Sequence, residues 1–155
     1  GSEMCIRDRY KPYEMPERCL VSAAHSTVST KSDETGLKPT DAAWVAGLID
    51  GEACFTFHNT PCISIDSTSP NVLEEVYRLF GGRCSPVNRR TSIGRPVFRW
   101  RIYGGNAIQV CKLTYEYLKD KKEQAALLSC VYKYPPRSSM REALIKRITE
   151  LKRII

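Results

Sequence analysis

The fold of this chain is decided by the stretch TDAAWVAGLIDGEACFTFH at residues 40–58. Its first half is apolar nearly all round, which is typical of a helix buried on every side. Thr40 or Asp41 can cap the start of that helix, and Gly51 is the kind of residue that ends one. We therefore predict a short buried helix that ends at Gly51.

Small residues recur along this helix at a spacing of one turn. Ala42 lies one turn before Ala46, and Ala43 lies one turn before Gly47. The distance between packed helices depends on the side chains at the contact, so small residues let two backbones come very close. The sequence therefore predicts a close helix–helix contact.

Beyond the helix the pattern changes to alternation. Phe55 and Phe57 alternate with Cys54, Thr56 and His58, which is typical of a half-buried strand. The pattern through residue 134 predicts, in order, elements at 41–50, 54–58, 62–66, 67–80, 84–90, 96–103, 106–118 and 121–134. This order, αββαββαα, predicts an α+β domain with one antiparallel sheet, helices on one face and polar side chains on the other.

The chain divides into three regions. Residues 1–39 are rich in Ser, Thr, Glu and Lys without apolar periodicity, and we expect a disordered or non-native N-terminal tail. Residues 40–136 form the domain, and residues 137–155 predict a basic amphipathic helix. There is no run of about 18 apolar residues, so we expect no membrane-spanning segment.

The seven cysteines are an odd number and form no CxxC pair. A zinc site needs ligands in closer pairs, and a secreted disulfide framework needs paired cysteines. We therefore expect a reduced intracellular protein whose thiols are mostly buried.

The positive charge is concentrated in one hairpin. The chain has a net charge of +7, and the segment from Arg83 to Arg101 holds six arginines and no acid. In its second strand, Arg99 and Arg101 alternate with inward-facing residues, so they point to the polar face. A two-stranded ribbon fits the DNA major groove, where arginine reads base edges. A solvated basic face is the alternative, and the arginine-rich hairpin favours DNA.

Residues 45–53, VAGLIDGEA, resemble the signature of the LAGLIDADG homing endonucleases in its LAGLIDGEG form, with seven of nine positions matching. The predicted order of elements over residues 41–134 also resembles this family, and YLKDKKEQA at 117–125 looks like the family's entry into its late helix. The resemblance does not cover the tail or the last helix. It implies a sheet whose polar face is a saddle for DNA.

The resemblance also implies an activity. Members are sequence-specific endonucleases that hydrolyse double-stranded DNA with Mg²⁺, for which Mn²⁺ can substitute. The single motif copy implies a homodimer formed through the motif helix, and a two-fold dimer implies a near-palindromic site. The expected location is intracellular, in the cytoplasm of a bacterial or phage-infected cell or in an organelle.

The family's active-site positions fall on three places in this chain. Glu52 is implied as the catalytic metal ligand, with the Gly51 carbonyl as a second ligand, because a hard cation prefers oxygen donors. Lys121 is the implied active-site cation, with Lys119 and Lys122 as neighbouring registers. Ser67 lies where the family often places a side chain that orders water.

The remaining assignments follow the same resemblance and the alternation. Ala53 replaces the last glycine of the motif, and we expect it to strain or shift Glu52 slightly, because glycine eases a backbone turn. The expected dimer interface comprises Ala43, Ala46, Gly47 and Asp50, with Asp50 mainly structural. The expected DNA-binding side chains are Thr56, His58, Ser64, Asp66, Asn88, Arg90, Arg99, Arg101 and Lys119.

Three alternative functions remain open. A DNA-binding protein of this fold need not cut, although retention of Glu52 argues for cutting. An intron RNA maturase uses the same fold on RNA, although the arginine-rich hairpin favours DNA. A small α+β enzyme or structural domain with a chance motif fits the order of elements least well.

Overall fold

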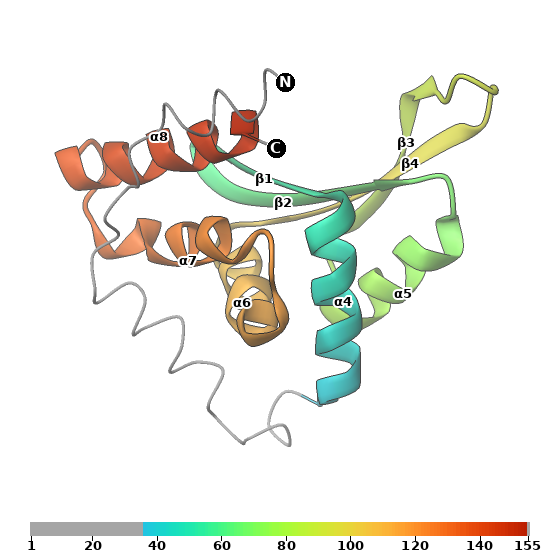
Figure 1. The fold of residues 1–155 in the computed structure, drawn as a ribbon, viewed down its shortest axis with the longest axis horizontal. Coiled ribbons are helices and arrows are strands. Elements are labelled where there is room, and N and C mark those ends of the chain that lie inside the picture. The colour runs from blue at the N-terminus through green and yellow to red at the C-terminus, as the bar shows by residue number, and fades with distance from the viewer. Residues whose placement is uncertain (1–35, 155) are drawn as a thin grey trace.

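The computed structural model describes residues 36–154, so most of the expected N-terminal tail lies outside the described residues. The chain is an α+β protein with a four-stranded antiparallel sheet in the order β1-β2-β4-β3, which confirms the predicted fold class (Figure 1). The elements are α4 (Pro39–Glu52), β1 (Ala53–His58), β2 (Thr60–Ser67), α5 (Pro70–Phe80), β3 (Arg83–Arg90), β4 (Pro96–Tyr103), α6 (Gly104–Thr114), η1 (Tyr115–Tyr117), α7 (Lys122–Cys130), η2 (Val131–Lys133) and α8 (Ser139–Ile154).

The helices α4, α5, α6 and α7 lie on one face of the sheet (Figure 1). Apolar side chains of the inner sheet face pack against them, and Phe55, Ile63, Ile65 and Trp100 are completely buried there. α8 packs against α7 and β1 and lies along the outer side of that edge strand (Figure 1). Within the described residues, no helix is long and apolar enough to cross a membrane.

The motif helix differs from the prediction at both ends. It begins at Pro39 with Lys38 at its cap, because proline at the first helical position has the right φ and no unused N–H. It continues through Gly51 to Glu52, and the N–H of Ala53 still donates to the Ile49 carbonyl. Glu52 is therefore the last helical residue rather than the first residue beyond the helix.

Ala53 shows no backbone strain. Its φ of −77° and ψ of 151° are ordinary extended values that any residue adopts. The expectation that alanine strains the Glu52 position was wrong, since the chain turns here without a positive φ.

The third helix is also displaced from its prediction. α6 begins at Gly104 rather than Asn106 and ends at Thr114, and the tighter turn η1 follows it instead of helix to Leu118. The Thr114 hydroxyl donates to the Val110 carbonyl at 2.8 Å, a local bond that competes with regular helix geometry.

The two edges of the sheet are built differently. β1 lies beside α8, whereas β3 forms the other edge and continues into the hairpin that projects from the body of the domain (Figure 1). β3 carries Pro86 opposite Phe98, and its register against β4 shifts between Val87 and Arg90.

None of the five cysteines in the described part of the chain is in a disulfide bond, and Cys62, Cys111 and Cys130 are buried. Complete burial raises the pKa of the Cys111 thiol to about 12, so this side chain is a neutral core residue. Cys54 and Cys84 are exposed, so the expectation of mostly buried thiols holds for three of these five.

Replacing Gly82 by alanine should destabilise the fold more than the same change at Gly81. Both glycines have positive φ, 90° and 74°, which costs alanine about 1–3 kcal/mol. A Cβ at Gly82 would also lie 2.5 Å from the Arg101 carbonyl oxygen and 2.8 Å from Trp100 Nε1, whereas a Cβ at Gly81 meets nothing within 4 Å. Urea unfolding of the two variants measures the difference, and equal midpoints would contradict the close approach.

Candidate nucleic-acid interface and active site

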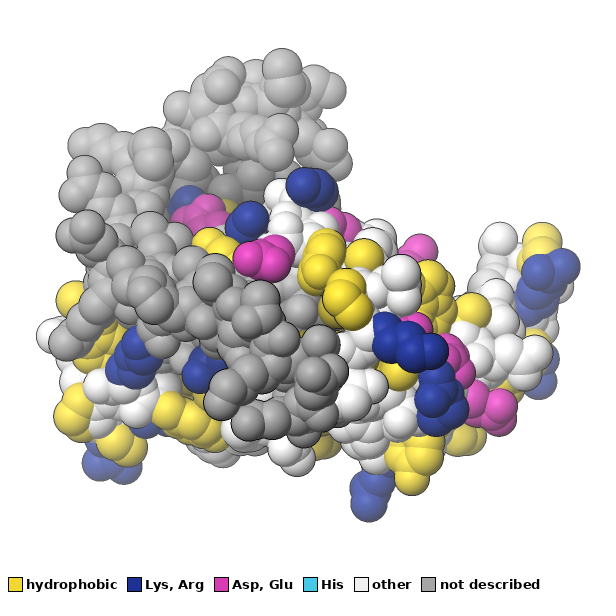
Figure 2. Space-filling model, turned by 90° about the horizontal axis from the view of Figure 1, so that it is seen from below, with side chains coloured by type: hydrophobic (Ala, Val, Ile, Leu, Met, Phe, Trp, Pro, Cys, Tyr) yellow, Lys and Arg dark blue, Asp and Glu magenta, His cyan; other side chains and the backbone are white. Residues whose placement is uncertain are grey.

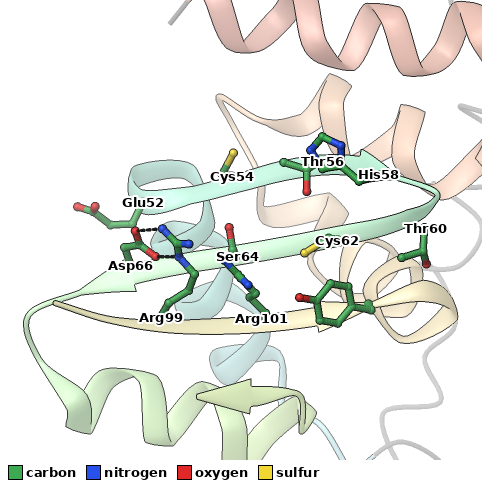
Figure 3. A pocket seen from close by; sticks show the side chains of 11 residues that line it. Glu52, Cys54, Thr56, His58, Thr60, Cys62, Ser64, Asp66, Arg99 and Arg101 are labelled. Carbon is green, nitrogen blue, oxygen red and sulfur yellow. Dashed lines mark hydrogen bonds and ion pairs between the residues drawn. The ribbon is translucent and has the colours of Figure 1, made fainter. Parts of the chain in front are cut away.

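The polar face of the sheet forms an open groove of about 590 Å³. Side chains from the end of α4 and from β1, β2 and β4 line it (Figure 3). The lining residues are Glu52, Cys54, Thr56, His58, Thr60, Cys62, Ser64, Asp66, Arg99, Arg101 and Tyr103. The strand alternation predicted from the sequence therefore places the expected polar side chains of three strands on one concave surface.

Four lining residues were not among the predicted site residues. Cys54, Thr60, Cys62 and Tyr103 follow the same alternation, so the pattern contained their position. Cysteine and tyrosine are also common core residues, and Thr60 was expected in the turn between two predicted strands, so none of the four signalled a site by residue type. Burial raises the pKa of the Cys62 thiol, so this side chain is a neutral group of the surface.

Besides Lys119, which precedes α7, two expected DNA-binding residues lie away from this groove. Asn88 and Arg90 are exposed on β3, where the register against β4 shifts, and neither lines the groove. Arg90 Nη1 donates to the Gly94 carbonyl oxygen at 2.9 Å within the hairpin turn. They belong to the projecting hairpin rather than to the central surface.

One end of the groove contains an ion pair between neighbouring strands (Figure 3). Asp66 on β2 is directly opposite Arg99 on β4, and both carboxylate oxygens accept bonds from the guanidinium. The bond to Asp66 raises the pKa of Arg99 above its ordinary value. Arg101, two residues along, forms no ion pair with any other described residue.

Glu52 lies at one end of the groove, close to Asp66 and Arg99, while His58 and Thr60 lie at the other end (Figure 3). Its carboxylate is exposed, as is Gly51 beside it. No set of three His, Cys, Asp or Glu side chains within residues 36–154 forms a metal cluster. A carboxylate and a carbonyl at an open helix end fit Mg²⁺, which usually keeps several waters and binds substrate phosphates.

The side chain of Lys121 is held at the end of the same helix. Its ammonium donates to the carbonyl oxygens of Ile49 and Asp50, at 3.0 and 3.1 Å, and the residue is 8% exposed. A cation is favoured here because the last carbonyls of a helix carry partial negative charge. Lys121 lines a smaller cavity with Ala53, Cys54, Gln124 and Lys152, next to the groove but separate from it.

Asp50 joins the motif helix to the segment before α7. Its carboxylate accepts hydrogen bonds from the backbone amides of Lys119, Asp120 and Lys121, at 2.7, 3.2 and 2.9 Å. These bonds fix the loop that carries the lysines and leave the Lys119 side chain exposed. Asp50 thus has a structural role inside the single chain, where it joins α4 to the segment before α7.

One stripe of α4 is exposed. Ala43 and Gly47 lie on it with Trp44, and a Cβ built on Gly47 meets nothing within 4 Å. Ala46 is completely buried in the chain's own core, so the stripe open to another helix does not include it. Seen from the helical side, positive and negative side chains are intermixed on the visible described surface (Figure 2).

Ser67 has a local partner. Its hydroxyl oxygen accepts a hydrogen bond of 3.0 Å from the Ser69 amide, at the turn that leads into α5. The side chain is half-buried and does not line the groove.

No protein-family model matches the chain, and no curated protein sequence matches it. Several solved structures are similar in fold. The homing endonuclease I-CvuI in complex with its target in the presence of Ca has a TM-score of 0.57 and 18% identity, covering 72% of this chain and 82% of that one. The same enzyme bound to a second target with Mg, with the DNA not cleaved, has a TM-score of 0.53 and 16% identity, covering 75% and 82%.

The archaeal intron-encoded homing endonuclease I-Vdi141I complexed with DNA has a TM-score of 0.57 and 16% identity, covering 75% of this chain and 84% of that one. At these identities the similarity shows a shared fold. The shared part extends over most of both chains.

Proposed function

We propose that this chain, which has the fold of the LAGLIDADG homing endonucleases, is a sequence-specific endonuclease of that family. It cuts double-stranded DNA at a near-palindromic site as a homodimer, with Mg²⁺, which Mn²⁺ can replace. The observation that carries the proposal is the placement of Glu52, which lies where the exposed stripe of the motif helix meets the polar groove of the sheet.

The chain's own groups divide the work. Glu52 and the Gly51 carbonyl are the groups that would hold the cation. When bound, Mg²⁺ supplies an activated water and neutralises charge on the scissile phosphate. Lys121 and Asp50 hold the end of α4 in place and so orient Glu52. The Lys121 ammonium donates to the last carbonyls of α4, and the Asp50 carboxylate accepts from the amides of the segment before α7.

The dimer follows from the exposed stripe of α4. Two copies packed through Ala43 and Gly47 would place two Glu52 carboxylates near each other at neighbouring helix ends. The DNA minor groove is only about 6 Å wide, so two acids that act on phosphates across it must lie close together. The small residues and the acid thus serve one arrangement.

A cleavage assay tests the proposal. The full chain is incubated with plasmids carrying a library of sites, in Mg²⁺ and in EDTA. Site-specific double-strand cuts in Mg²⁺ alone support it. Specific binding without cuts supports the non-cleaving DNA-binding protein, and preferential binding of intron RNA supports the maturase.

Arg101→Ala and Lys119→Ala should affect DNA binding in different ways. Arg101 points into the groove from β4, and a bidentate arginine–guanine contact is worth about 1–3 kcal/mol of discrimination. Loss of the Arg101 side chain should relax the base preference at one position of each half-site. Lys119 is exposed beside the helix end, where a phosphate contact positions without reading sequence.

Binding-site selection and affinity at several salt concentrations separate the two effects. Lys119→Ala should weaken binding evenly across sequences and lower the salt dependence by about one phosphate contact. If Arg101→Ala kept the full sequence preference, β4 would not read bases and the proposed orientation of the sheet would be incorrect.

A further inference from the structure

We propose that Asp66 is a positioning residue for Arg99, and that the two form one unit that reads a single guanine in each half-site. This assigns Asp66 to the protein side of the contact instead of to a base of its own. The inference rests on the proposed function, because it concerns how the groove recognises DNA.

The geometry of the pair carries the inference. Asp66 and Arg99 are register partners on adjacent strands, so their Cβ atoms are held close by the sheet itself. Arg99 donates through Nε to one carboxylate oxygen and through Nη2 to the other, the latter at 2.8 Å. A bidentate bond of this kind fixes the plane of the guanidinium as well as its place.

The pair leaves one edge of Arg99 available to DNA. The bonds to Asp66 use two of the five N–H groups of the guanidinium, and Nη1 has no partner among residues 36–154. The Nη1 and Nη2 ends can still donate side by side to guanine O6 and N7. The side chains are only 27% and 22% exposed, so both lie low in the groove and keep a restricted orientation.

Arg101 provides the contrast on the same strand. It lines the same groove, but no other described residue forms an ion pair with it. An arginine without an ion-pair partner loses rotamer freedom when it is fixed on a base, whereas Arg99 is already held by Asp66 before DNA arrives. The base preference of Arg99 should therefore depend on Asp66, whereas the base preference of Arg101 should not depend on an acidic partner.

Binding-site selection with the full chain, in EDTA so that no DNA is cut, tests the proposal. The variants are Arg99→Ala, Asp66→Ala, Asp66→Asn and the double variant Asp66→Ala/Arg99→Ala. Ser85→Ala is the matched control, because Ser85 is the register partner of Arg99 on the other side, in β3. Affinity for a duplex that lacks the selected site is measured in parallel.

We expect Arg99→Ala to reduce the guanine preference at one position by about 5- to 150-fold. Asp66→Ala should reduce the guanine preference at the same position by at least about fivefold, and Asp66→Asn should reduce it by less. The double variant should lose no more of this preference than Arg99→Ala loses alone. Asp66→Ala should at the same time bind the non-site duplex more tightly, because a negative charge is removed from the surface. A loss of folding would lower both affinities, so the opposite signs identify positioning.

Several outcomes would overturn the inference. Asp66→Ala could leave the guanine preference unchanged, or raise it, which would mean that the pair holds Arg99 away from DNA. A loss at a different position would assign Asp66 to its own base. If the wild type selects no site at all, the proposed function fails, and that result is distinct from an Asp66 variant that behaves like the wild type.

Discussion

Glu52→Gln should lower the rate of DNA cleavage by at least ~10³-fold and leave DNA binding nearly unchanged. Metal-assisted charge stabilisation is worth several kcal/mol, and each factor of ten in rate corresponds to about 1.4 kcal/mol. The amide has nearly the same volume as the carboxylate but no charge to hold a cation. Glu52 is exposed and forms no ion pair with another described residue, so the substitution should not affect the fold.

The measurement is conversion of supercoiled plasmid to linear product in Mg²⁺, with binding followed by gel shift. Glu74→Gln is the control, since Glu74 is another exposed carboxylate but belongs to α5. Cleavage at the wild-type rate by the Glu52 variant would remove Glu52 from the active site.

Gly47→Leu should abolish dimer formation without destabilising the single chain. In the single chain the new side chain has space, because a Cβ at Gly47 has no heavy atom within 4 Å. Leucine is also a better helix former than glycine, by up to about 1 kcal/mol. In a dimer packed through this stripe of α4, leucine would occupy the position of the partner's backbone, and overpacking of that kind is costly.

Light scattering gives the mass in solution, and thermal unfolding gives the stability of the chain. Wild type should have twice the mass of one chain, Gly47→Leu the mass of one chain, and Gly47→Ala should remain largely dimeric. A wild type that is monomeric both with and without DNA would disprove the symmetric arrangement, and so would a leucine variant that still forms dimers.

The fold was predictable because its elements repeat local patterns. Alternation at Phe55 and Phe57, and again at Ile63 and Ile65, gave the strands and the face of each side chain. The end of α4 was predicted less well, because Gly51 often ends a helix but here stays helical. Local propensity is weak compared with the burial of Ile49 beneath the sheet.

The site was predictable only in part, because its bonds join residues far apart in sequence. Asp66 and Arg99 were both expected to face DNA, but their pairing depends on the register of β2 against β4, which are not consecutive strands. The bonds from the segment 119–121 to Asp50 connect positions about 70 residues apart. No periodicity in the sequence reports such contacts.

The two protected edges of the sheet also limit how this protein can associate with itself. An open strand edge is a template on which further strands from other molecules can assemble. On the β3 edge, Pro86 lacks a backbone N–H donor, and the register shift beyond Val87 interrupts the regular strand. The exposed Arg83 and Arg90 add repulsion between two such edges. α8 occupies the flank of β1. Sheet-to-sheet aggregation is therefore disfavoured at both ends even in concentrated solution, which leaves a helical surface as the route to ordered self-association.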